Sequence, residues 1–289
     1  MLTLTEREYR KHPAISRTQL FRLKDSPEKF KYFEENPEPP SPALKFGQLL
    51  HAMVLQPETV GEQFAIAPNV DRRTKGGKEM WAEFEEQAES KTVVTADMAE
   101  QAIAMRDKLF GNELVKELLN GEKEKPFFWT DELTGEECKC RADIIYQTIL
   151  TDPQTGERYP AVEVVDLKTT ENAKTNAFSH SIDKYGYDFQ AGMYLEGIKK
   201  NMPKTGIVDG VEKPVVFSFV FVAIEKKPPY SINVMYAEDN VLTRGFDLFR
   251  EYIGTYHYCK TTNNWYGYMG KHGEINSLSL PAWLAKEIE

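Results

Sequence analysis

The sequence contains few cysteines and no long apolar run. Its three cysteines, Cys138, Cys140 and Cys259, cannot all pair with one another, as is typical of a protein kept in a reducing compartment. No apolar stretch approaches the roughly 20 residues that a membrane-spanning helix requires. The first residues, MLTLTEREYRKHP, are too polar for a secretory signal. We therefore expect a soluble, cytoplasmic protein with no membrane partner.

No linker rich in glycine, serine or proline divides the 289 residues. A chain of this length without such a linker favours one elaborated domain over two. Within it we expect a helical N-terminal region over residues 1–94, a mixed α/β core over 95–224, and a C-terminal strand, helix and tail over 225–289. Hydrophobic residues make up 41% of the chain, which is an ordinary value for a globular protein.

The chain also lacks an excess of positive charge. Lys and Arg number 36 against 45 Asp and Glu, and the net charge of -9 argues against a protein that coats nucleic acid through a general positive field. The segment DRRTKGGK at residues 71–78 is an exception, with four basic residues and one acidic residue. A solvated loop explains this charge equally well. Its basic side chains are nevertheless candidate DNA contacts: Arg72, Arg73, Lys75 and Lys78.

Capping residues and hydrophobic periodicity predict both helices and strands. Ser41 before Pro42 is typical of a helix start, because serine can cap a helix and proline suits its first turn. The predicted helices cover residues 42–55, 77–90, 95–120, 185–200 and 239–260. The predicted strands cover 126–132, 137–150, 161–170, 215–224 and 230–236, and turn-rich segments join the first three into an antiparallel meander. From residue 95 the order is therefore helix, three strands, helix, strand.

Two charged residues interrupt the apolar strand AVEVVDLKTT at residues 161–170. Residues two apart in a strand share a face, so Asp166 and Lys168 lie side by side. Asp143 lies on the preceding strand, and cross-strand neighbours are about 5 Å apart. Two carboxylates at this spacing repel each other unless a cation lies between them. Mg²⁺ prefers oxygen ligands and often takes only one or two protein carboxylates, so it suits this pair.

A surface ion pair is the simpler explanation for an Asp-x-Lys sequence on a strand, and such a pair implies no chemistry. The valines before Asp166 predict burial, and a buried charge needs compensation, which favours a metal site. Glu163 lies three residues before Asp166 and falls on the opposite face of the strand. We therefore interpret Glu163 as structural or solvent-facing.

These residues resemble the PD-(D/E)XK nuclease motif in its D-x-K form, with Asp143 ahead of Asp166-Leu167-Lys168. The order of helix, three strands, helix and strand is similar to the αβββαβ core of that superfamily, which includes restriction endonucleases. The resemblance implies an α/β (mixed α+β) fold in which helices flank a central mixed sheet, with an added helical N-terminal region.

Two further motifs resemble those of RecB-like and exonuclease VIII (RecE)-like members. Gly47-Gln-Leu-Leu-His51 resembles their G-x-x-x-H motif, and Gln190-Ala-Gly-Met-Tyr194 resembles their Q-x-x-x-Y motif. Residues four apart share a helix face, as both motifs require. Without the other motifs, His51 is better explained as a core histidine. Ordinary helix polarity and a packed tyrosine remain an equal alternative for Gln190 and Tyr194.

The resemblance implies a role for each matching residue. The ligands of Mg²⁺ or Mn²⁺ are implied to be Asp143, Asp166, the backbone carbonyl of Leu167, and His51. Lys168 is implied to serve the attacking water, and Gln190 and Tyr194 to position the strands or the DNA. Some relatives, such as the AddB-like proteins, hold an iron–sulfur cluster with four cysteines. This chain has three, two of them inside the core as Cys138-x-Cys140, so we expect no cluster.

The resemblance implies a metal-dependent phage or prophage exonuclease that hydrolyses phosphodiester bonds at the ends of double-stranded DNA during recombination. By analogy it also implies a ring-shaped homo-oligomer and a single-strand annealing protein as a partner. One alternative is a non-catalytic DNA-binding or assembly protein that keeps the fold, although intact Asp143, Asp166 and Lys168 argue against it. Another is an enzyme for a small anionic substrate, which requires a closed pocket.

The aromatic segment NNWYGYMG at residues 263–270 leaves two interpretations open. Trp265, Tyr266 and Tyr268 can stack on unpaired bases. They can also seal a core or a subunit contact, which is the more common use of such residues.

Overall fold

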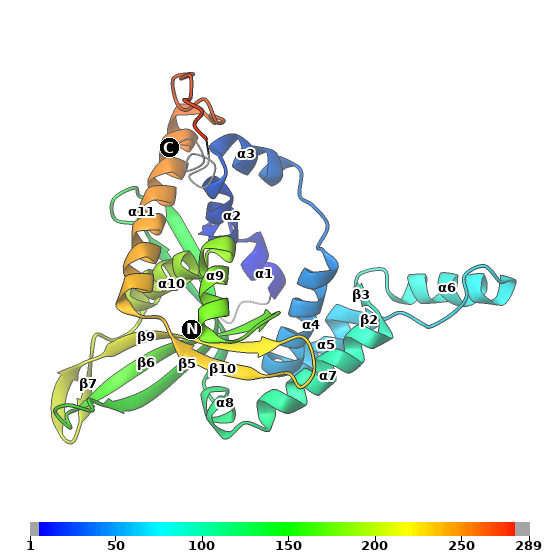
Figure 1. Ribbon diagram of the computed structural model, residues 1–289, viewed down its shortest axis with the longest axis horizontal. Coiled ribbons are helices and arrows are strands. Elements are labelled where there is room, and N and C mark those ends of the chain that lie inside the picture. The colour runs from blue at the N-terminus through cyan, green and yellow to red at the C-terminus, as the bar shows by residue number, and fades with distance from the viewer. Residues whose placement is uncertain (1–5, 281–289) are drawn as a thin grey trace.

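The computed structural model describes residues 6–280 and is built around a six-stranded sheet (Figure 1). Three long strands form the antiparallel meander expected from the sequence, namely β4 (Glu122–Thr130), β5 (Glu137–Thr151) and β6 (Arg158–Thr170). β9 (Val216–Glu225) runs parallel to β6, and β10 (Ile232–Tyr236) pairs with β9 in the antiparallel sense. The short β1 (Ile15–Ser16) pairs with β5 in parallel. The sheet is therefore mixed, as predicted.

Alternating side chains of the strands divide the interior into two cores. On β9, Phe219 and Phe221 belong to one hydrophobic cluster, whereas Val220 and Val222 belong to the other. Successive residues of a strand point to opposite faces, so the two clusters lie on opposite faces of the sheet. This apolar run is typical of a strand covered on both sides.

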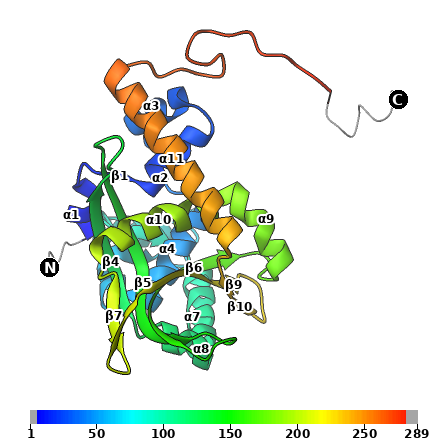
Figure 2. The same ribbon diagram turned by 90° about the vertical axis from the view of Figure 1, so that its left-hand side faces the viewer.

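Different helices cover the two faces (Figure 2). The first core receives side chains from α2 (Arg17–Phe21), α3 (Pro27–Glu35), α9 (Thr175–Tyr185), α10 (Tyr187–Asn201) and α11 (Asp239–Thr262). The second receives side chains from α4 (Pro42–Leu55), α7 (Ala96–Phe110) and α8 (Glu113–Leu118). The order α7–α8, β4, β5, β6, α10, β9 reproduces the predicted αβββαβ core. Within the described residues, no helix is both long and apolar enough to span a membrane.

The helix predicted over residues 95–120 is wrong in one respect, because the structure divides it into α7 and α8. The break falls at Gly111 and Asn112. The side chain of Asn112 accepts a hydrogen bond from the backbone N–H of Val115 at 3.0 Å and so caps a new helix. The short α9, between β6 and α10, was not predicted, and its N-terminus has no side-chain cap.

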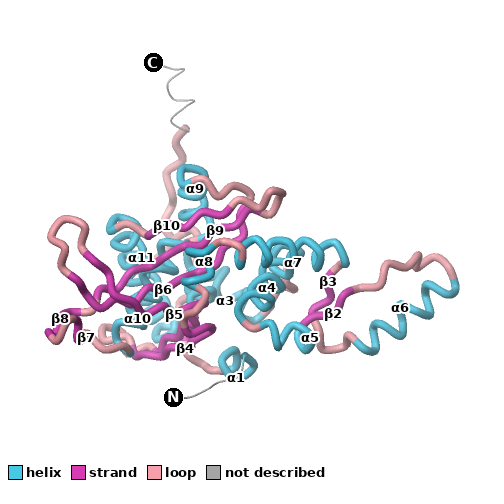
Figure 3. Tube along the Cα trace, turned by 90° about the horizontal axis from the view of Figure 1, so that it is seen from below, coloured by secondary structure: helices cyan, strands magenta, loops and turns pink. Residues whose placement is uncertain are grey.

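A slender arm leaves the body between α4 and α7 (Figures 1 and 3). The short α5 (Val60–Gln63) leads into it, and its base is the parallel pair of β2 (Phe64–Ile66) and β3 (Thr92–Val94). Its outer part is α6 (Lys75–Gln87), which corresponds to the helix predicted over 77–90. A second projection is the hairpin of β7 (Thr205–Val208) and β8 (Val211–Pro214). The segment at α1 (Glu6–Lys11) precedes β1.

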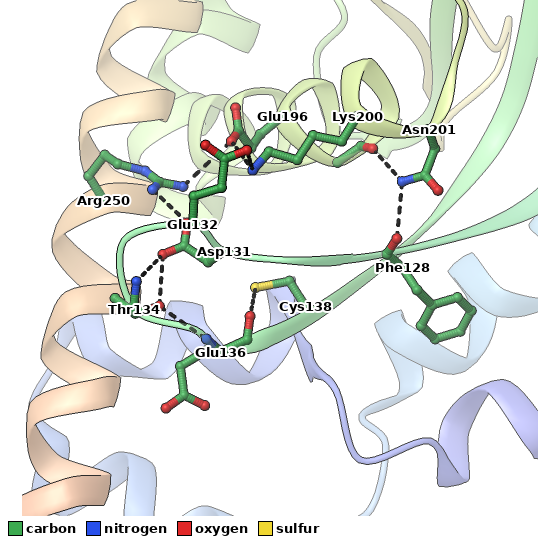
Figure 4. Close-up of polar contacts among 11 residues, drawn as sticks. Phe128, Asp131, Glu132, Thr134, Glu136, Cys138, Glu196, Lys200, Asn201 and Arg250 are labelled. Carbon is green, nitrogen blue, oxygen red and sulfur yellow. Dashed lines mark hydrogen bonds and ion pairs between the residues drawn. The ribbon is translucent and has the colours of Figure 1, made fainter.

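Two buried carboxylates form ion pairs that join the turn between β4 and β5 to α11, and Figure 4 shows the pair of Asp131 and Arg250. Asp131 is fully buried, and its Oδ1 accepts hydrogen bonds from the backbone N and the Oγ1 of Thr134 at 3.0 and 2.7 Å. Its Oδ2 lies 2.6 Å from Nη1 of Arg250 on α11. Glu136, at the end of the same turn, pairs with Lys260, which lies nearly three helical turns after Arg250 on α11. These contacts join the turn to α11 and satisfy both carboxylate oxygens of Asp131.

The cysteines and the C-terminal aromatic segment contribute to packing. All three cysteines are free and buried. The ring of Trp265 stacks on Phe30 of α3, with centroids 5.3 Å apart and planes at 4°. Tyr268 is exposed, and Nζ of Lys29 lies 5.4 Å from its ring centroid. The sealing interpretation therefore holds for Trp265.

Candidate active site

The candidate site lies where β5 and β6 stop pairing. Their regular ladder ends at the pair Ile144 and Val165, and the next position on the two strands is occupied by Asp143 and Asp166. Beyond this pair the backbone N–H of Leu167 donates a hydrogen bond to Oδ2 of Asp143, at 2.9 Å, in place of a backbone acceptor. The end of the ladder thereby places the two predicted carboxylates side by side.

Asp166 is the most enclosed of the predicted site residues. Only 2% of its surface is exposed, and its Oδ1 accepts a hydrogen bond from Nε2 of Gln190 on α10 at 2.5 Å. Its Oδ2 makes an ion pair with Nζ of Lys168 at 2.5 Å, but no hydrogen bond of normal orientation reaches this buried atom. Burial raises the pKa of Asp166, and the carboxylate of Asp143 raises it further, against the opposing effect of Lys168.

His51 lies on α4, which covers the face of the sheet opposite to α10, and it reaches the end of the β5–β6 ladder from that side. Nε2 of His51 lies 2.7 Å from the carbonyl oxygen of Leu167. A carbonyl can only accept, so Nε2 carries the proton. Nδ1 then faces Oδ2 of Asp143 at 3.5 Å. The G-x-x-x-H motif therefore contacts the D-x-K motif through the carbonyl oxygen of Leu167. This is the backbone atom that the resemblance implies as a metal ligand.

One carboxylate of the site was missed by the sequence analysis. Ligand atoms of Glu124, His51 and Asp143 all lie within 4.8 Å of one another. Burial and the carboxylates of Asp143 and Asp166 raise the pKa of Glu124 to about 8, although Nε of Arg141 lies 2.6 Å from its Oε2. Glu124 lies in the EKEK segment ahead of the predicted start of the strand at residue 126, which is why it was overlooked.

The donor set fits a divalent cation. It consists of carboxylate oxygens, one backbone carbonyl and one imidazole, the ligands that Mg²⁺ and Mn²⁺ use. Three carboxylates crowd together here, and the buried Oδ2 of Asp166 has no hydrogen bond. A cation held by this set would offset their repulsion.

The other predicted residues lie at different distances from this cluster. Tyr194 lies on α10, one turn after Gln190, and packs in the core beside Phe219, with ring centroids 6.4 Å apart. Burial raises the pKa of its phenol well above the usual value. Glu163 is buried on the other face of β6, where Tyr236 donates a hydrogen bond to it at 2.6 Å. Glu163 is thus structural, one of the two alternatives kept open for it.

The structure does not bring the basic loop to the carboxylates. The predicted DNA contacts lie on the arm, at the start of α6 and just before it, and are exposed: Arg72, Arg73, Lys75 and Lys78. The guanidinium of Arg72 lies 4.1 Å from the ring centroid of Trp81. Lys75 makes only a long, solvent-exposed ion pair with Glu79, at 3.9 Å. These side chains are therefore exposed to solvent on the arm, outside the body of the protein.

Comparisons with known proteins agree with this geometry. Residues 16–277 match the model of the PDDEXK-like domain family of unknown function (DUF3799), and the chain belongs to that family. The structure superposes on that of a protein from Eubacterium rectale, described as a "putative exonuclease", with a TM-score of 0.57 and 13% identity, over 99% of this chain and 98% of the other. At that identity the likeness shows the fold alone.

Two other comparisons add nothing to the argument. The structure of SSO0001 superposes with a TM-score of 0.28 and 15% identity, over 72% of this chain and 85% of the other, which is too low to bear on fold or function. No curated protein matches the chain. The fold and the family together place the protein in the PD-(D/E)XK nuclease superfamily and support a nuclease.

Proposed function

We propose that the protein is a Mg²⁺- or Mn²⁺-dependent exodeoxyribonuclease that acts at the ends of double-stranded DNA. The observation that carries this proposal is that Asp143, Asp166 and Lys168 lie together at the point where β5 and β6 stop pairing. His51 contacts the backbone carbonyl of Leu167 at the same point. Phosphodiester hydrolysis needs a positioned water and positive charge near the phosphate; a bound cation would supply the first, and the cation and Lys168 the second.

The side chains of the site have distinct tasks in such a reaction. A divalent cation would activate water and offset the negative charge of the phosphate. Gln190 holds one oxygen of Asp166, which fixes the orientation of that carboxylate. The ammonium of Lys168 lies against the other oxygen, where it can donate a hydrogen bond to an incoming water or to a phosphate oxygen. The hydrogen bond from the backbone N–H of Leu167 to Asp143 joins the two strands at this point.

A small anionic substrate is less well supported. It would need an enclosed pocket at the carboxylates. A surface cavity of about 520 Å³ is instead lined by residues of α7, the loop after it and β10, including Asp107, Lys108 and Ser231. None of the site carboxylates lines that cavity.

DNA is proposed to reach the site past the arm, whose basic residues Arg72, Arg73, Lys75 and Lys78 would contact phosphates outside the body. The resemblance to RecE-like exonucleases further favours a cytoplasmic role in phage or prophage recombination, with a single-strand annealing protein as partner. A ring-shaped homo-oligomer would be consistent with this role. These finer assignments are proposals that rest on the resemblance.

Degradation of DNA of two topologies tests the proposal. Labelled linear duplex and closed circular duplex are incubated with Mg²⁺ and either the wild type, Lys168→Ala or the control Lys199→Ala, an exposed lysine at the end of α10. We expect the wild type and Lys199→Ala to degrade linear DNA only, and Lys168→Ala to be inactive. Loss of the circle would indicate an endonuclease. Binding of linear DNA without any degradation would support the non-catalytic alternative.

A further inference from the structure

Glu124 lies outside every motif of the superfamily that this chain displays, yet it points into the site. It belongs to β4, whose regular pairing with β5 is interrupted at this residue. The partners run from Lys123 with Ile144 to Lys125 with Ala142, which leaves Glu124 unpaired opposite Asp143. The backbone φ of Glu124 is +51°, in the left-handed region that glutamate rarely adopts. Strained backbone of this kind is found preferentially at functional sites.

A second contact fixes the direction of the Glu124 side chain. Nε of Arg141, two residues before Asp143 on β5, lies 2.6 Å from Oε2 of Glu124. The side chain of Glu124 is 11% exposed, so this ion pair is shielded from water. A carboxylate has roughly four lone-pair sites on its two oxygens. The ion pair therefore anchors Glu124 and leaves it able to accept a further partner.

The ligand atoms around Glu124 are those that bind a cation. Nε2 of His51 donates to the carbonyl of Leu167, so the other ring nitrogen, Nδ1, is the one turned toward Oδ2 of Asp143, at 3.5 Å. Ligand atoms bound to one ion at about 2.1–2.4 Å lie roughly 3–4.5 Å apart. The ligand atoms of Glu124, His51 and Asp143 lie within 4.8 Å of one another, close to that spacing. Independently, the neighbouring Asp166 is 2% exposed, and its Oδ2 has no hydrogen bond beside its ion pair with Lys168.

We propose that Glu124 is a third carboxylate ligand of the cation centre, held in position by Arg141. The proposal rests on the metal-dependent function proposed above and adds a ligand from β4, a strand that carries no part of the D-x-K motif. It also gives Arg141 a task, as a positioning residue that acts through Glu124 and does not touch the cation.

Binding of Mn²⁺ without DNA tests this proposal, because it does not depend on catalysis. Isothermal titration calorimetry would compare the wild type with Glu124→Gln, Asp143→Asn and the matched control Glu122→Gln, an exposed glutamate of the same strand. We expect Glu124→Gln and Asp143→Asn each to weaken Mn²⁺ binding by at least about tenfold. Glu122→Gln should bind as the wild type does.

The outcomes separate this proposal from the proposed function. Wild-type affinity in Glu124→Gln, together with lost affinity in Asp143→Asn, would overturn the role of Glu124 and leave the centre intact. Wild-type affinity in both variants would overturn the centre itself. Glu124→Asp keeps the charge with a shorter reach and guards against misfolding of the glutamine variant. We expect it to bind Mn²⁺ more tightly than Glu124→Gln, and equal binding by the two folded variants would contradict a ligand role.

Discussion

Two aspartates of this protein are almost equally buried, but their surroundings shift their pKa values in opposite directions. Asp131, in the turn between β4 and β5, is 0% exposed, and Asp166, near the end of β6, is 2% exposed. Each faces one basic side chain, Arg250 or Lys168. Burial alone would raise the pKa of both. At Asp131 the hydrogen bonds from Thr134 and Arg250 outweigh burial and lower the pKa, whereas at Asp166 burial and the neighbouring Asp143 prevail and raise it.

The difference separates a charge that stabilises the fold from one that the proposed function would use. Both oxygens of the Asp131 carboxylate accept hydrogen bonds from its own turn or from α11, so this carboxylate stabilises the turn and has no oxygen left for a ligand. Asp166 shares its surroundings with other carboxylates and keeps one buried oxygen without a hydrogen bond. Buried polar groups that the fold leaves unsatisfied are typical of sites completed by a ligand.

The largest expected effect is the loss of activity when a site carboxylate is neutralised. Asp143→Asn should reduce the rate of DNA hydrolysis by at least about 100-fold, because it removes charge where the reaction requires it. Glu163→Gln is the matched control, a buried glutamate on the other face of β6 that should retain the wild-type rate. Single-turnover rates on linear duplex measure the difference. Equal rates for the two variants would contradict the assignment of the active site to Asp143 and of a structural role to Glu163.

The next effect is on stability and concerns the other aspartate. Arg250→Ala leaves Asp131 buried without its cation, which should lower the free energy of unfolding by about 2–4 kcal/mol, less than for a fully buried pair because Arg250 is 25% exposed. Urea denaturation measures it. Lys75→Ala removes a long, exposed ion pair with Glu79 and should cost well under about 1 kcal/mol. A similar small cost for Arg250→Ala would show that the turn is not fastened as described.

The two aspartates should also make stability depend on pH in opposite ways. The lowered folded-state pKa of Asp131 contributes stability above its unfolded pKa of about 3.9, and that contribution is lost as the pH falls through the folded value. The raised folded-state pKa of Asp166 favours folding at low pH, and that contribution is lost as the pH rises through it. Without metal, the stability of Asp166→Asn relative to the wild type should therefore increase as the pH rises.

Thermal unfolding in a chelator at several pH values measures both slopes. The deficit of Asp131→Asn relative to the wild type should shrink toward low pH. Parallel curves for the wild type and Asp166→Asn would contradict the environment assigned to Asp166.

The smallest effect is expected on the arm. Replacing Arg72 and Arg73 by alanine should weaken DNA binding without changing stability, because both side chains are exposed. If each contacts one phosphate, the slope of log K against log salt concentration should decrease by about 0.9 per contact. Fluorescence anisotropy with duplex DNA in Ca²⁺ measures the slope, and Lys213→Ala on the β7–β8 hairpin serves as control. An unchanged slope would remove the arm from the DNA path.

The sequence contained most of the fold and the centre of the site. Strand alternation placed Asp166 and Lys168 on one face and Glu163 on the other, and motif resemblance located His51 and Gln190. The strand faces could be predicted because side chains alternate regularly along a strand, whereas the positions of His51 and Gln190 came from the motifs. Gln190 was left with two explanations, since only the folded chain shows that its amide reaches Asp166 across 24 residues of sequence.

The features that escaped prediction are local departures from regular structure. Glu124 enters the site through a backbone angle that breaks the alternation of β4, and no residue type in EKEK signals such an angle. α9 has no side-chain cap, so its start carries no marker in the sequence. The division of α7 from α8 depends on whether Asn112 caps a helix or lies within one, a choice that tertiary packing decides.

The most direct test compares the two aspartates in one assay. Asp166→Asn and Asp131→Asn would each be incubated with linear duplex DNA and Mg²⁺ at a temperature at which both remain folded, and nucleotide release would be measured. We expect Asp166→Asn to be at least about 100-fold slower than the wild type and Asp131→Asn to release nucleotides at nearly the wild-type rate. Wild-type activity in Asp166→Asn, or equal loss in both variants, would contradict the assignment of the site to the end of β6.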